Sequence, residues 1–117
     1  MDQRFTWNER LHKRKEFQKV FEKGKIFKNE QIKIHALLNN SPVSRLGLVV
    51  GKKFGNAVKR NRYKRIFREA YRLNKNLLKN GVDLVILPRH GLNDLSLKAV
   101  EENFKDLLTQ INLKFEI

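Results

Sequence analysis

The chain has 117 residues, of which 26 are lysine or arginine and 12 are aspartate or glutamate, so its formal net charge is +14. This length predicts a single domain over residues 1–117, and the 40% hydrophobic fraction argues against wholesale disorder. The absence of cysteine excludes a disulfide scaffold, a thiolate metal site and a cysteine nucleophile.

The apolar runs are about five residues long at most, far below the roughly 20 that a bilayer-spanning helix needs. We read no signal peptide, so we expect a cytoplasmic protein without a membrane partner. A charge this high implies a polyanionic partner, with nucleic acid ahead of a membrane surface.

The first half of the chain predicts one helix and two strands. Helical spacing of apolar residues predicts a helix over residues 13–23, which Gly24 ends in a left-handed conformation. Alternating polarity predicts a half-buried strand over 31–38, and a turn separates it from a second strand over 45–51. Their proximity in sequence favours an antiparallel hairpin.

The second half predicts a long helix over residues 56–75, a short apolar strand over 82–88 and a last helix over 96–113. The order α-β-β-α-β-α predicts an α/β (α+β) two-layer sandwich with helices packed against one small sheet. The apolar stripe expected on the long helix consists of Ile66, Ala70, Leu73 and Leu77. The polar face expected beside it consists of Arg60, Asn61, Lys64, Arg65 and Arg68.

The positive charge is concentrated in one block. Between Lys52 and Lys75 there are ten basic residues and one acid, Glu69. Such a block indicates a face built for phosphates, and the alternative is a solvated helix face without a partner. Gly51 and Gly55 flank the lysines before the helix, but they complete neither of the common glycine-rich nucleotide-binding motifs.

Three ring side chains have two open interpretations. Phe17 and Phe21 lie one turn apart on the first predicted helix, where such pairs are usually core but can also stack on single-stranded bases. His35 falls on the non-core face of its predicted strand, as an ordinary exposed residue or as a stacking group. His12, His35 and His90 are far apart, so we expect no catalytic residue on this protein.

The most informative segment is long and unusual. It closely resembles the signature of the protein subunit of bacterial ribonuclease P, and the order of elements matches that family over essentially the whole chain. The matching residues are Lys52-Lys53-Phe54-Gly55-Asn56-Ala57-Val58-Lys59-Arg60-Asn61-Arg62-Tyr63-Lys64-Arg65, continuing to Arg68-Glu69.

The resemblance implies a fold with a left-handed βαβ crossover and a protein that does not itself cleave RNA. In that family a catalytic RNA subunit binds divalent metal ions such as Mg²⁺ and removes the 5′ leader of precursor tRNA. The implied partners are therefore that RNA and the leader, with no obligate protein partner and no metal held tightly by the protein. The implied RNA-binding set is Lys52, Lys53, Asn56, Arg60, Asn61, Arg62, Lys64, Arg65 and Arg68. The implied leader cleft contains Phe17, Phe21 and His35.

Two other functions stay open from the residues alone. A structural RNA-binding protein of the ribosomal type would share the basic helix without needing a leader cleft. An autonomous ribonuclease would instead depend on one of the histidines.

Overall fold

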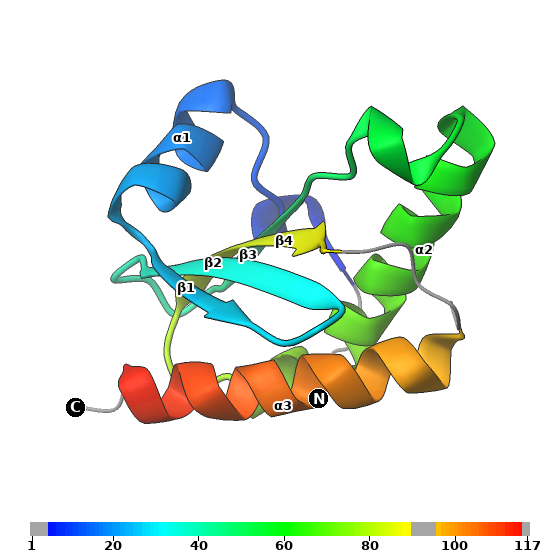
Figure 1. Ribbon diagram of the computed structural model, residues 1–117. Helices are drawn as coiled ribbons and strands as arrows, with labels where there is room; N and C mark the ends of the chain where they lie inside the picture. The colour runs from blue at the N-terminus through cyan, green and yellow to red at the C-terminus, as the bar shows by residue number, and fades with distance from the viewer. Residues whose placement is uncertain (1–4, 90–95, 116–117) are drawn as a thin grey trace.

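The computed structural model describes residues 5–89 and 96–115 (Figure 1). It contains helices α1 (Arg14–Lys23), α2 (Ala57–Asn74) and α3 (Leu97–Lys114), and strands β1 (Lys25–Lys28), β2 (Ile32–Leu38), β3 (Arg45–Leu48) and β4 (Val82–Pro88). Three short 3₁₀ turns are η1 (Trp7–Glu9), η2 (Lys52–Phe54) and η3 (Lys75–Leu77). In this part of the chain, no helix combines the length and the apolar character that crossing a membrane requires.

The helices begin where side chains satisfy their first backbone amides. The Asn56 side chain accepts a hydrogen bond from the Lys59 amide at 3.0 Å, and Ser96 accepts one from Ala99 at 3.2 Å. At α1, Glu16 Oε1 accepts from the backbone amides of His12 and Lys13 at 2.9 and 2.8 Å. These hydrogen bonds from the backbone, together with nearby Arg45, lower the Glu16 pKa.

The left-handed conformation predicted for Gly24 is wrong. Gly24 is extended, with φ −75° and ψ 163°, because the chain runs directly from α1 into β1. A glycine is needed there for a different reason. A Cβ at this position would lie 2.4 Å from the carbonyl oxygen of Val20, so the close approach of the backbone excludes any side chain.

The sheet has the strand order β1-β2-β4-β3, with β2 antiparallel to both of its neighbours and β3 parallel to β4. The predicted hairpin between residues 31–38 and 45–51 is therefore wrong, because β4 lies between these strands. The side chains of β4 are buried on both faces of the sheet. A central position suits such a strand, because helices cover the sheet there on both sides. The hairpin partner of β2 is β1, a short strand that the sequence analysis missed.

The predicted fold class and element order are confirmed, with β1 added. Helices α2 and α3 pack on one face of the sheet, and α1 crosses part of the other (Figure 1). Even-numbered residues of β2 and β4, such as Ile34 and Leu84, face the main core, while Val85 faces α1 together with Val20. The unit β3–α2–β4 is the parallel crossover for which the resemblance implies a left-handed connection.

The apolar side of α2 differs from the predicted stripe. Of the four predicted residues only Ala70 is fully buried; Ile66 and Leu73 are half-buried, and Leu77 is 45% exposed. The buried face consists of Tyr63, Phe67, Ala70, Tyr71 and Asn74. The three aromatic rings offer more apolar surface than the aliphatic residues, so the helix turns that side inward. The buried face of α3 consists of Val100, Phe104, Leu107, Leu108 and Ile111.

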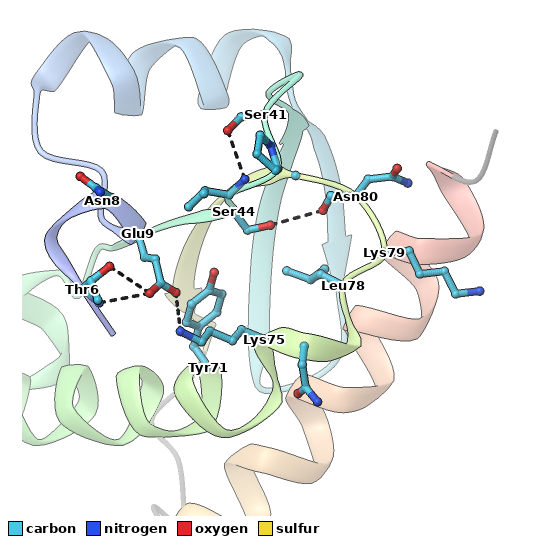
Figure 2. A pocket seen from close by; sticks show the side chains of 14 residues that line it. Thr6, Asn8, Glu9, Ser41, Ser44, Tyr71, Lys75, Leu78, Lys79 and Asn80 are labelled. Carbon is cyan, nitrogen blue, oxygen red and sulfur yellow. Dashed lines mark hydrogen bonds and ion pairs between the residues drawn. The ribbon is translucent and has the colours of Figure 1, made fainter. Parts of the chain in front are cut away.

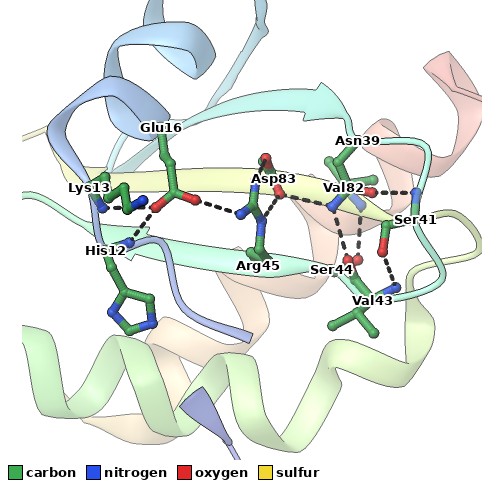
Figure 3. A network of polar contacts seen from close by, with 10 residues as sticks. All are labelled: His12, Lys13, Glu16, Asn39, Ser41, Val43, Ser44, Arg45, Val82 and Asp83. Carbon is green, nitrogen blue, oxygen red and sulfur yellow. Dashed lines mark hydrogen bonds and ion pairs between the residues drawn. The ribbon is translucent and has the colours of Figure 1, made fainter. Parts of the chain in front are cut away.

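One polar network joins α1 to the sheet (Figure 3). Arg45 on β3 and Asp83 on β4 lie directly opposite each other, and Asp83 is only 4% exposed. The Asp83 carboxylate accepts from Arg45 Nε at 2.9 Å and from Nη2 at 2.6 Å, and it also accepts from the Asn39 amide at 2.8 Å. Arg45 Nη1 donates to Glu16 on α1 at 2.6 Å. One guanidinium therefore neutralises a buried acid and holds α1 in place.

Replacing Arg45 with alanine leaves the buried Asp83 carboxylate without its cation. We expect Arg45→Ala to lower the free energy of unfolding by about 1.5–3 kcal/mol, measured by urea denaturation. The control is Arg72→Ala, which removes a surface ion pair with Glu69 and should change stability little. An equal loss in both variants would contradict a structural role for the network.

Candidate nucleic-acid interface

The loop before α2 presents cations beside an open helix N-terminus. Lys52 and Lys53 in η2 are exposed, and Asn56 caps the helix. Gly55 joins them with φ +119°, a conformation that favours glycine. No acidic residue occupies the first turn of α2, so its positive end faces solvent without a compensating charge. The loop and the helix start are therefore suited to bind an anion.

The cations of α2 form a stripe beside the buried aromatic face. Asn61, Arg62 and Arg65 are exposed, while Arg60, Lys64 and Arg68 are half-buried. Within residues 5–89 and 96–115, no carboxylate forms an ion pair with any lysine or arginine from Lys52 to Arg68. Glu69, the acid inside the block, pairs with Arg72 instead. This leaves the stripe with uncompensated positive charge.

Two arginines of the stripe, Arg60 and Arg68, are half-buried. The Arg68 pKa is lowered by partial burial and by the neighbouring charges of Arg10 and Arg65. Arg60 Nε is buried and has no hydrogen-bond partner among the described residues. A bound anion would relieve the repulsion around Arg68, and it would add to the phosphate contacts that the exposed arginines can make.

On the other face of the sheet, the structure brings Phe17, Phe21 and His35 together. Phe17 is half-buried, and its ring packs directly over Gly47 of β3. Phe21 is 38% exposed and contacts His35 edge-to-face, with ring centroids 4.8 Å apart. Of the two phenylalanines, Phe21 is the more exposed, while Phe17 packs on Gly47 and also lines a cavity at the surface.

His35 lies on the face away from the main core, as predicted, but it is not exposed. Its exposed fraction is 8%, because α1 and Phe21 cover it. Burial and the nearby charge of Lys33 lower the His35 pKa, so the imidazole is neutral at neutral pH. The His35 ring therefore presents little surface to a ligand while Phe21 covers it.

A groove of about 600 Å³ connects this face of the sheet to the loop before α2. Its lining combines the apolar residues Val49 and Leu87 with cations that include Lys33, Lys53 and Arg89. Lys33 and Arg89 are not among the site residues expected from the sequence. The outward position of Lys33 in an alternating strand was the available signal, whereas the position of Arg89 depends on the tertiary fold, where its Nη1 donates to the Asn29 carbonyl at 2.6 Å.

A second cavity, of about 700 Å³, lies at another edge of the fold (Figure 2). Two of its three charged side chains form an ion pair, because Lys75 Nζ and Glu9 Oε2 are 2.6 Å apart, and Glu9 also accepts from Thr6. The third charged side chain is that of Lys79. Tyr71 projects its hydroxyl toward this pair, and burial raises the Tyr71 pKa. A cavity whose lining combines an acid with lysines does not share the electrostatics of the α2 stripe.

The described residues contain no group of three or more histidine, cysteine, aspartate or glutamate side chains placed to hold a metal ion. His12 lies exposed before α1 and His35 is buried in β2, so the fold does not bring these two histidines into one site. His90 lies outside the described residues.

The chain is similar to known proteins over most of its length. The family model for ribonuclease P matches residues 5–112. The ribonuclease P protein component of Clostridioides difficile is 37% identical over 110 residues, covering 93% of this chain and 96% of the relative. That of Thermotoga maritima is 38% identical over 115 residues, covering 95% and 98%.

Solved structures show the same fold. The ribonuclease P protein from Thermotoga maritima has a TM-score of 0.80 at 38% identity and covers 87% of this chain and 96% of its own. The protein from Staphylococcus aureus has a TM-score of 0.78 at 29% identity and covers 88% and 94%.

The contact between Phe17 and Gly47 can be tested with a matched pair of glycines. A Cβ at position 47 would lie 2.4 Å from Phe17 Cε1, whereas a Cβ at Gly51 would meet no heavy atom within 4 Å. We expect Gly47→Ala to lower the free energy of unfolding by about 1–3 kcal/mol, because the ring must shift. Gly51→Ala should leave stability unchanged or slightly raised. Equal urea midpoints for the two variants would show that Phe17 is not packed there.

Proposed function

Because the chain belongs to the ribonuclease P protein family, we propose that it binds the catalytic RNA subunit through α2 and the preceding loop. In this proposal it also holds the 5′ leader of precursor tRNA on the α1 side of the sheet. The family supports a role in tRNA processing with an RNA partner. The residue-level contacts are our proposal.

The uncompensated cation stripe is the observation that carries this proposal. Lysine and arginine release condensed counterions when they contact phosphates, so unpaired cations contribute most to RNA affinity. Arginine also fits two phosphate oxygens with its planar fork. Because α2 is a packed helix, the spacing of Arg62, Arg65 and Arg68 is held constant, which favours a folded RNA of complementary shape.

The leader is proposed to lie along the α1 face of the sheet. Phe21 offers an accessible ring over His35, and the groove beyond it is lined by Lys33, Lys53 and Arg89. An aromatic ring followed by spaced cations suits the alternation of bases and phosphates in a single strand. Asn61 is exposed on α2 and can donate to or accept from a base or a ribose hydroxyl.

The protein is proposed to assist hydrolysis without catalysing it. A cation-rich surface repels a divalent ion, so we assign the metal to the RNA subunit, where it would activate the attacking water. The residues of α2 would bind the RNA and screen the repulsion between its phosphates and those of the substrate. Holding the leader would position the scissile phosphate at the RNA active site.

This role is tested by reconstitution. At low magnesium, the protein mixed with a bacterial catalytic RNA and precursor tRNA should accelerate leader removal above the rate of the RNA alone, because it screens phosphate repulsion. The readout is cleavage of end-labelled precursor tRNA. Cleavage by protein alone, or no stimulation, would overturn the proposal.

Binding titrations with the catalytic RNA at several salt concentrations separate α2 from other basic surfaces. Arg65→Ala should weaken binding to the catalytic RNA and reduce the slope of log K against log salt by somewhat under one unit. The control is Lys98→Ala, an exposed cation on α3. Equal effects of both variants would indicate a diffuse electrostatic attraction instead of a defined interface.

Leader binding has its own test. We expect Phe21→Ala to reduce affinity for precursor tRNA by about 5- to 100-fold, from the loss of stacking on one base, while binding to mature tRNA is unchanged. The control Val43→Ala removes a side chain of similar exposure, 40% against 38%, from a loop outside the proposed cleft. If Phe21→Ala weakens binding of mature tRNA equally, Phe21 does not contact the leader, and a ribosomal-type role without a leader cleft gains support.

A further inference from the structure

The segment before α1 carries an aromatic pair that contributes little to the core. Trp7 is 73% exposed, and its ring is stacked on His12 with centroids 3.6 Å apart and an interplanar angle of 20°. The stack is held in place by the backbone, since His12 Nε2–H donates to the Trp7 carbonyl at 2.9 Å. Glu16 in turn accepts from the His12 amide. A large, flat apolar surface is thus presented to solvent in a defined orientation.

Cations surround this stack. Trp7 and His12 line a cavity of about 310 Å³ together with Arg10, Lys64 and Arg68. Arg10 is exposed and lies over the Phe5 ring at 4.5 Å, while Lys64 and Arg68 reach the cavity from α2. Among the described residues, none that lines this cavity is acidic. The cavity therefore joins an aromatic platform to three positive side chains.

We propose that Trp7 and His12 form a stacking platform for one unpaired nucleobase of the catalytic RNA, whose neighbouring phosphates bind Arg10, Lys64 and Arg68. A nucleotide places a flat ring one sugar away from a negative phosphate, which is the alternation that this cavity offers. The crowding of Arg68 by Arg10 supports the need for an anion at this point.

The catalytic RNA is favoured over the leader for a geometric reason. Two of the three cations belong to α2, the helix proposed to bind that RNA. Of the residues of the implied leader cleft, Phe17 lines this cavity, whereas Phe21 and His35 do not. The inference rests on the proposed function, because it assigns an additional contact within the same RNA complex. Trp7, His12 and Arg10 extend that contact beyond the residues that the signature contains.

Trp7 is the one tryptophan of the chain, so its fluorescence reports directly on the platform. The full-length protein is titrated with catalytic RNA in the absence of precursor tRNA, and binding is followed in parallel by anisotropy of labelled RNA. We expect Trp7 emission to be quenched with the same midpoint as binding, because the base stacks on the indole. Binding without a change in emission would overturn the inference. Quenching that occurs only after a leader oligonucleotide is added would overturn the assignment to the catalytic RNA.

Substitutions separate stacking from structure. Trp7→Leu should weaken binding to the catalytic RNA by about 5- to 100-fold, whereas Trp7→Phe, which keeps a ring, should retain most of the affinity. The control Leu113→Ala removes an apolar side chain of similar exposure, 69% against 73%, from α3. Thermal unfolding checks that the variants fold.

Each outcome has one meaning. Equal losses of affinity in Trp7→Leu and Trp7→Phe, or a loss matched by a lower unfolding temperature, would overturn the stacking role. If Trp7→Leu binds and stimulates the RNA as well as the unaltered protein, this inference fails while the proposed function stands. If the unaltered protein does not bind the catalytic RNA, the proposed function itself fails.

Discussion

The burial of Tyr63, Phe67 and Tyr71 beneath α2 is the interaction on which the rest of the structure depends. A fully buried side chain of this size stabilises the fold by about 1.5–3 kcal/mol, whereas a like-charged pair one helical turn apart costs a few tenths of a kcal/mol. Packing on the inner face therefore outweighs repulsion on the outer face. The helix can carry Arg60, Lys64 and Arg68 in one row because its other side is held so firmly.

Strand β4 holds the structures on the two faces of the sheet in place relative to each other. Its residues alternate between the main core and the α1 side, and Asp83 on that strand holds Arg45, which in turn holds Glu16 of α1. The parallel pairing of β3 with β4 then directs the chain into the basic loop and α2. In this way the proposed leader surface and the cation stripe are parts of one rigid framework.

Particular elements show where prediction from sequence succeeds. The last helix and the strands at 31–38 and 82–88 were recovered because their periodicity is local and strong. One uninterrupted segment of the sequence was enough to identify the family. The cation stripe was predicted from the density of basic residues in that same part of the chain. The predicted hairpin was wrong because strands that are neighbours in sequence need not be neighbours in the sheet. The predicted apolar stripe of α2 was misplaced because that helix carries apolar residues on more than one face. Helical spacing could not show that Phe17 is less exposed than Phe21, because this difference depends on packing against Gly47, a residue 30 positions away from Phe17.

The sequence by itself determined the three helices and the strands other than β1, the concentration of positive charge and membership of the ribonuclease P protein family. These properties depend on residues that are close together in the chain. Only the tertiary structure decided which aromatic rings are buried, that β4 lies between β2 and β3, and that Trp7 and His12 share a cavity with Lys64 and Arg68. Those outcomes depend on packing between distant segments, where the burial of one surface determines which other surface is left exposed.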